Sequence, residues 1–170
     1  MTLFTANPAA GTVSALGETH PASFGKGGFC PAADKREGDG KTPLGLWPIR
    51  AALLRPDRLP APQTKLPWRW LRPWDGWSDG VGDPAYNRPV FTPHRFSHEA
   101  LWRTDHAYDL ILVLAHNDSQ PVPGLGSAIF WHVAQPDGRP TEGCIAMERA
   151  VLFRWLEAMA PGDAVLVSTK

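Results

Sequence analysis

Proline is the residue that most constrains this chain, because it occurs 18 times among 170 residues. A proline ring fixes φ and removes a backbone N–H, so it is poorly tolerated inside helices and central strands. Sixteen glycines add to the unusual composition. We therefore expect short elements joined by many turns, which favours a mainly β architecture over a helical bundle.

Length and charge narrow the class of protein further. The chain can build one hydrophobic core but not two comfortable ones, and 43% of its residues are apolar. Seventeen Lys and Arg residues balance seventeen Asp and Glu residues, which gives no electrostatic case for nucleic acid or an anionic membrane. We predict a single domain over residues 1–170, monomeric and without a nucleic-acid partner.

The N-terminal stretch MTLFTANPAAG has neither a basic segment nor a long apolar segment, so no signal peptide is recognised. No window is apolar enough to span a bilayer, and no transmembrane segment is expected. Two cysteines, Cys30 and Cys144, are too few for a disulfide scaffold. These features fit a cytoplasmic protein, or one exported by an unconventional route.

Three segments with clear periodicity are expected to build the core. Residues 109–115 (DLILVLA) and 127–133 (SAIFWHV) are apolar on both faces, which predicts central strands. Residues 148–160 carry one apolar stripe and end at Pro161-Gly162, which predicts the main helix. Turn and cap signals predict a strand over 44–50, a short second helix over 97–103 and a closing strand over 164–168.

Residues 53–82 are expected to form an irregular insertion rich in proline and tryptophan. Prolines interrupt every periodicity there, and a loop of this length is typically functional, a lid for example. The segment carries Trp68, Trp70, Trp74 and Trp77. They either stack on sugar rings or form a satellite hydrophobic cluster, and we favour the cluster. The charged run KREGDGK nearby is interpreted as a solvated turn.

The segment TEGCIAM, residues 141–147, is the strongest candidate for chemistry. Cys144 follows a glycine, and His132 lies twelve residues upstream across a segment full of turn formers. Gly143 frees the backbone so that two consecutive N–H groups can point at a developing oxyanion. The helix that begins shortly afterwards would favour a thiolate. The pattern indicates a Cys–His acyl-transfer site, against the alternative of an ordinary buried cysteine and histidine.

Two segments in the right order resemble the L,D-transpeptidase catalytic domain, the YkuD-type family. The stretch HVAQPDGRPTEGCIAM matches its signature at His132, Thr141, Gly143, Cys144 and Ile145. Residues 42–47 (TPLGLW) resemble a T-P-x-G-x-aromatic segment near the start of that domain. The resemblance extends from about residue 25 to the C-terminus. It implies a sandwich or partly closed barrel of mixed strands, with one main C-terminal helix and a short second helix.

The same resemblance implies a function and roles for residues. Cys144 would be the nucleophile and His132 the base, with the backbone carbonyl of Thr141 orienting the imidazole. The N–H groups of Gly143 and Cys144 would hold the oxyanion. The donor would be a peptidoglycan stem peptide and the acceptor an amine, joined in a 3→3 crosslink through a thioester. The family implies a role in cell-wall biogenesis and cell shape, a periplasmic or wall location, and no metal or cofactor.

Two positions depart from the signature, and they leave alternatives open. Glu142 stands where the family has a second histidine, and Ala146 where it has a polar residue. The departures concern how substrate is held. One alternative is an L,D-carboxypeptidase or endopeptidase using the same Cys–His site. Another is a non-catalytic wall-glycan-binding module that uses the tryptophans. Five further residues are candidates for substrate binding: His116, Asn117, Trp131, Arg139 and Glu142.

Overall fold

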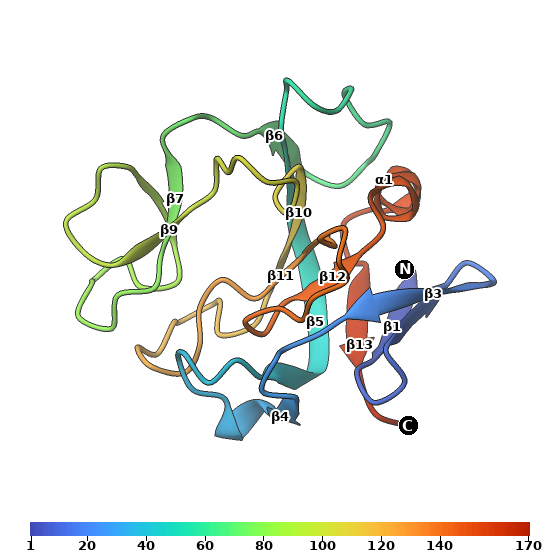
Figure 1. Ribbon diagram of the computed structural model, residues 1–170, viewed down its shortest axis with the longest axis horizontal. Coiled ribbons are helices and arrows are strands. Elements are labelled where there is room, and N and C mark those ends of the chain that lie inside the picture. Colours follow the sequence, from blue (N-terminus) through green and yellow to red (C-terminus); the bar gives the residue numbers. More distant parts are fainter.

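A closed ring of eight strands forms the body of the protein in the computed structural model, which describes residues 1–170 (Figure 1). Strand β10 pairs with β5 and thereby closes the ring. In pairing order its members are β10 (Leu110–Leu114), β11 (Phe130–Val133), β12 (Ile145–Met147), β3 (Glu18–Ser23), β2 (Thr12–Ala15), β1 (Leu3–Asn7), β13 (Ala164–Val167) and β5 (Thr42–Leu54). The pairs β1–β13 and β11–β12 are parallel, so the sheet is mixed. A mainly β fold with a barrel of mixed strands is therefore confirmed.

Five shorter strands lie outside this ring. Strands β4 (Phe29–Pro31) and β6 (Trp68–Trp70) each pair in parallel with β5. The other three form a separate sheet of order β8-β7-β9, with β8 (Pro89–Phe91), β7 (Asp75–Ser78) and β9 (His98–Ala100). This small sheet stands to one side of the barrel, next to β10 and β11 (Figure 1).

Strands β10 and β11 are buried on both faces, as the sequence predicts. Leu112 and Trp131 belong to the core inside the barrel. Their neighbours Ile111 and Phe130 belong to a second cluster, which also holds Trp77 and Leu101 of the region around the small sheet. Because side chains alternate along a strand, β10 and β11 form the wall between two cores. Positions 130 and 132 face the outer core and the small sheet.

The one α-helix, α1 (Arg149–Ala158), confirms the predicted main helix. Val151, Leu152, Trp155 and Leu156 are its buried residues, and they join the inner core. The chain then turns at residues 161–162 into β13, which confirms the predicted closing strand. No helix in the structure is long and apolar enough to cross a membrane.

The predicted short second helix over 97–103 is wrong. His98–Ala100 form β9, which pairs antiparallel with β7 in the register Trp77↔Glu99. A single turn of helix gains few hydrogen bonds for the backbone it fixes, whereas a ladder with β7 satisfies the same groups. The other helical element is a short 3₁₀ turn at Ala32–Asp34.

The expectation of an irregular segment over 53–82 is wrong for β6 and β7, which lie within it. Trp68 and Trp70 pack against the inner core and meet edge to face at 5.0 Å. Trp77 is buried and donates its indole N–H to Asn87 Oδ1 at 2.9 Å. Trp74 alone among the four is largely exposed, at 49%. Trp68, Trp70 and Trp77 therefore serve packing, as the preferred interpretation predicts, and Trp74 does not.

The charged run KREGDGK is more than a solvated turn, so that interpretation is wrong. Lys35 is only 2% exposed and forms an ion pair with Asp39. Asp39 also accepts the backbone N–H groups of Arg36 and Lys41, at 2.9 and 2.8 Å. A buried ammonium is stable only when it is paired, and this turn supplies the partner.

Candidate active site

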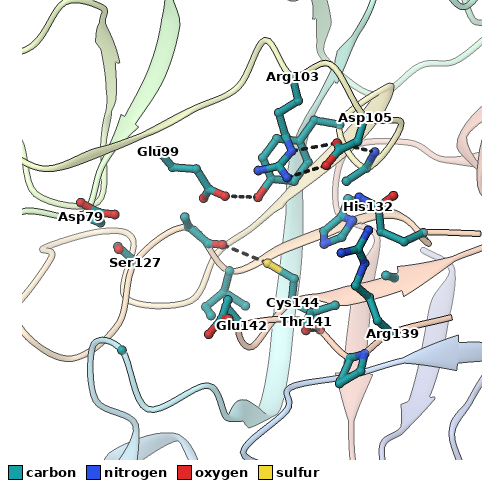
Figure 2. Close-up of a pocket in the computed structure, with 18 of the residues that line it drawn as sticks. Asp79, Glu99, Arg103, Asp105, Ser127, His132, Arg139, Thr141, Glu142 and Cys144 are labelled. Atoms are coloured by element: carbon teal, nitrogen blue, oxygen red, sulfur yellow. Dashed lines mark hydrogen bonds and ion pairs between the residues drawn. The ribbon is translucent and has the colours of Figure 1, made fainter. Parts of the chain in front are cut away.

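Strands β11 and β12 place His132 and Cys144 on one face of the sheet. In their parallel register Trp131 lies opposite Ile145, and His132 opposite Ala146. Trp131 and Ile145 both point into the inner core. Because side chains alternate along a strand, His132 and Ala146 face outward. Cys144 lies two residues before Ala146 and therefore faces outward as well. Figure 2 shows the imidazole and the sulfur in the same pocket.

This pocket has a volume of about 600 Å³ and lies between the barrel and the small sheet. The barrel contributes His132 and Cys144, and the loop before β12 contributes Arg139 and Glu142. The opposite wall carries acidic and hydrogen-bonding side chains, among them Glu37. Figure 2 shows three others, Asp79, Glu99 and Ser127. The nucleophile candidate thus lies at the base of a cavity large enough for a peptide segment.

The Cys144 thiol is protonated in this environment. Its Sγ donates to the Ala128 carbonyl at 3.2 Å and accepts the Phe130 backbone N–H at 3.4 Å. Burial, followed by the negative charge of Glu99, raises the pKa of Cys144 to about 12. Strand β12 separates the sulfur from the start of α1, so the expected helix-terminus effect on the thiolate does not arise.

His132 is buried, and burial lowers its pKa to about 4, so the imidazole is neutral. Its Nδ1 lies 2.9 Å from the Val133 carbonyl oxygen. A carbonyl oxygen only accepts, so Nδ1 carries the proton and Nε2 has the free lone pair of a base. The ring is further fixed by Tyr108, whose ring meets it edge to face at 5.2 Å.

The backbone carbonyl of Thr141 does not orient the imidazole, and that expectation is wrong. This carbonyl accepts the Lys26 backbone N–H at 2.7 Å, and Val133 takes the expected role. Thr141 acts through its side chain instead. Its Oγ1 accepts the Gly143 N–H at 3.1 Å and donates to the Cys144 carbonyl at 2.7 Å. The hydroxyl thereby closes the turn that presents the cysteine.

Gly143 is needed for conformation and for space. Its φ is +133°, and a Cβ there would lie 2.7 Å from the Lys41 carbonyl oxygen. The loop is held against residues 24–42 by hydrogen bonds on both sides of Thr141, including Thr141 N–H to Phe24 O at 2.8 Å. The side chain of Thr42 anchors that segment by accepting the Gly25 N–H at 2.8 Å. The TPLGLW segment, residues 42–47, therefore helps to hold the loop that carries Cys144.

The structure brings two of the five substrate-binding candidates into the pocket. Arg139 and Glu142 line it, and both are exposed in ion pairs, with Asp137 at 3.3 Å and with Lys26 at 2.7 Å. The other three candidates do not line this pocket: His116, Asn117 and Trp131.

Packing explains why the side chains of these three residues lie outside the pocket. Trp131 is fully buried in the inner core, because it alternates with His132 along β11. His116 is buried against Trp47, with its Nε2 bonded to the Leu125 carbonyl at 3.0 Å. Asn117 holds its own loop through bonds to Val122 and Gly126.

Sequence reasoning missed four pocket residues that lie between the small sheet and β10. Tyr108 is buried and donates its hydroxyl to Glu99. Arg103 forms a two-pronged pair with Asp105, at 2.9 and 2.6 Å (Figure 2). Their sequence signal is weak, because isolated charges beside short strands look like solvated loop residues. Only the fold carries them to the cysteine.

A thiol and a neutral imidazole line one pocket beside a constrained Gly-Cys turn, and these are the residue types that cysteine acyl-transfer sites use. The model of the L,D-transpeptidase catalytic domain family, YkuD, matches residues 11–167. The chain belongs to this family. The comparison with curated proteins found no match.

One solved structure with a TM-score above 0.5 agrees with this fold. Bd1075 of Bdellovibrio bacteriovorus has a TM-score of 0.51 at 14% identity, over 99% of this chain and 48% of that one. L,D-transpeptidase 1 of Mycobacterium tuberculosis has a TM-score of 0.43 at 15% identity, over 98% of this chain and 58% of that one. An L,D-transpeptidase of Mycobacterium smegmatis gives 0.43 at 18% identity, with the same coverages. The chain therefore spans about half the length of the structures that it matches.

Proposed function

We propose that this protein is a cysteine-dependent L,D-transpeptidase acting on peptidoglycan stem peptides. The observation that carries the proposal is that His132 on β11 and Cys144, directly before the parallel strand β12, line one pocket. Membership of the YkuD family supplies the substrate class. A periplasmic or wall location follows from that substrate and is part of the proposal.

Acylation begins with both groups neutral. Cys144 Sγ attacks the carbonyl carbon of the donor peptide bond, and its proton passes to Nε2 of His132 as the bond forms. A thiol pKa of about 12 and an imidazole pKa of about 4 disfavour a preformed ion pair, so this transfer accompanies attack. The imidazolium then protonates the departing amine, and a thioester remains on Cys144.

The oxyanion would be held by the backbone N–H groups of Gly143 and Cys144. In the free protein the Gly143 N–H is donated to Thr141 Oγ1. A developing negative charge is a stronger acceptor than a hydroxyl, so the bond would be exchanged during attack. In the second half-reaction an amine attacks the thioester and yields a 3→3 crosslink. Water in place of the amine yields hydrolysis.

The binding-module alternative receives little support from the tryptophans. Trp68, Trp70 and Trp77 are engaged in packing, and exposed Trp74 alone offers a face for sugar. The hydrolase alternative uses the same two residues. It differs from the transpeptidase only in the acceptor that attacks the thioester, which is water and not an amine. The two enzymatic readings therefore share every step up to the thioester.

Intact-protein mass spectrometry after exposure to a carbapenem tests the nucleophile. We expect one adduct on the wild type and on Cys30→Ala, and none on Cys144→Ala. Cys30 is the matched control because it is the other buried free thiol. Purified stem peptides with and without an acceptor amine then separate transfer from hydrolysis. A folded wild type that forms neither a carbapenem adduct nor a stem-peptide product contradicts the proposal.

A further inference from the structure

The wall of the pocket opposite His132 is rich in carboxylates. Glu37, Asp79 and Glu99 all line it, and Figure 2 shows Glu99 and Asp79 on the same side of the sulfur. Glu37 accepts hydroxyl hydrogen bonds from Tyr86 and Ser127. These donors are neutral, so the charge of Glu37 stays uncompensated. The wall therefore presents net negative charge to the cavity.

The cations of the pocket are already engaged with other carboxylates. Lys35 pairs with Asp39, and Arg139 with Asp137. Arg103 directs two guanidinium N–H groups at Asp105, although its charge also attracts Glu99. None of these side chains donates a hydrogen bond to Glu99. Burial raises the pKa of Glu99, so its ionised form lacks a close hydrogen-bonded cation that would stabilise it. A cationic ligand would supply that partner.

Two further observations point to a ligand here. The Oδ1 atom of Asp79 is buried and has no hydrogen-bond partner in the protein, which is costly for a carboxylate unless a ligand donor completes it. Glu99 is held in place because one of its oxygens accepts the Tyr108 hydroxyl. Its second oxygen makes no protein hydrogen bond. The wall thus carries carboxylate oxygens that are fixed in position and can accept hydrogen bonds from a ligand.

We propose that Glu99, supported by Asp79, binds the ammonium group of the acceptor amine and places it beside the thioester on Cys144. This inference rests on the proposed function. A primary alkylamine has a pKa near that of lysine, about 10.4, so it arrives protonated and charged at neutral pH. A fixed carboxylate is the complementary partner, and a hydrogen bond between charged groups is stronger than one between neutral groups.

The position of Glu99 also suits the chemistry of transfer. Tyr108 contacts both Glu99 through its hydroxyl and His132 through its ring, so the three residues are contiguous. An amine held at Glu99 therefore shares the pocket with the base. It loses one proton to solvent, its nitrogen bonds to the carbonyl carbon, and the C–S electron pair returns to sulfur. The second proton passes through His132 to the sulfur, which leaves as a thiol.

The test starts from the acyl-enzyme formed with a donor stem peptide, followed by a titration of two acceptors. Nα-acetyllysine amide supplies a cationic amine, and hydroxylamine is a nucleophile that is largely uncharged at neutral pH. Glu99→Gln keeps the shape and the Tyr108 bond but removes the charge. We expect it to raise the acceptor KM for the lysine derivative roughly 10-fold and to leave the KM for hydroxylamine unchanged.

A matched control and a second variant complete the experiment. Glu157→Gln makes the same change on the exposed face of α1 and should alter neither KM. If Glu99→Gln does not fold, Asp79→Asn is expected to raise the KM for the lysine derivative about threefold.

Three results would overturn the inference alone. These are equal shifts for both acceptors, no shift for either, or an acyl-enzyme that takes no amine at all. Absence of any acyl-enzyme in the wild type would overturn the proposed function as well.

Discussion

The environment of Cys144 predicts a thiol that is slow toward general alkylating reagents. Burial and Glu99 raise its pKa from 9.0 to about 12, which lowers the thiolate fraction at neutral pH by about 1,000-fold. A more basic thiolate is intrinsically more nucleophilic, with a Brønsted slope of about 0.4–0.5. The rate constant of the thiolate itself is therefore higher by roughly 15- to 30-fold, which offsets part of the loss in thiolate fraction. The net expectation is a rate roughly 30- to 60-fold below that of a free cysteine peptide, before any steric protection.

The assay is the rate of iodoacetamide labelling, followed by peptide mapping so that Cys144 and Cys30 are measured separately. We expect the Cys144 rate to rise about tenfold for each pH unit, without a plateau between about pH 6 and pH 10. A carbapenem should still acylate Cys144 at neutral pH, because His132 takes the proton as the bond forms. A labelling rate that reaches a plateau at or below neutral pH would refute this reasoning, since it would demonstrate a preformed thiolate–imidazolium pair.

Two other predictions concern the base and the turn. His132 has a pKa of about 4 when folded and an ordinary 6.5 when unfolded, so the unfolded state binds the proton first. Its stabilising contribution is present above pH 6.5 and falls by roughly 3 kcal/mol toward pH 4, measured as the pH dependence of denaturant unfolding. Gly143→Ala should cost about 2 kcal/mol of unfolding free energy and slow carbapenem acylation, because the added Cβ meets the Lys41 carbonyl at φ +133°.

Each of these two predictions has a control and a contradicting result. The pH dependence should be smaller in His132→Gln, where the contribution of His116 remains because burial lowers its pKa as well. Identical pH profiles for that variant and the wild type would contradict the assignment. For the turn, Gly82→Ala is the matched change, since a Cβ there meets nothing within 4 Å. Equal stability and equal acylation in the two glycine variants would show that the turn tolerates a side chain.

Much of the architecture is local enough to be read from the sequence. The apolar runs around 110–114 and 130–133 become β10 and β11, because strands buried on both faces need apolar residues at every position. The apolar stripe of α1 and the Pro-Gly stop after it are equally local. The second helix was mispredicted because its few residues have no strong preference of their own, and β7 decided their conformation.

The candidate site divides in the same way between sequence and tertiary structure. Cys144, Gly143 and His132 are recognisable because turn chemistry and strand alternation act over a dozen residues. Alternation also excludes Trp131, whose side chain enters the opposite core. Glu99, Tyr108 and Asp79 escaped notice, since they line the same pocket as Cys144 only when the small sheet packs against β10 and β11.

The sequence by itself determined a turn-rich β fold, its central strands, its helix and the cysteine–histidine pair. Tertiary structure decided the protonation state of that pair, because burial lowers the pKa of His132, and burial together with the Glu99 carboxylate raises the pKa of Cys144. It also decided that Val133, and not Thr141, orients the imidazole. The physical reason is range: periodicity and turn preferences act between near neighbours, whereas desolvation and charge act between whatever residues the folded chain brings together.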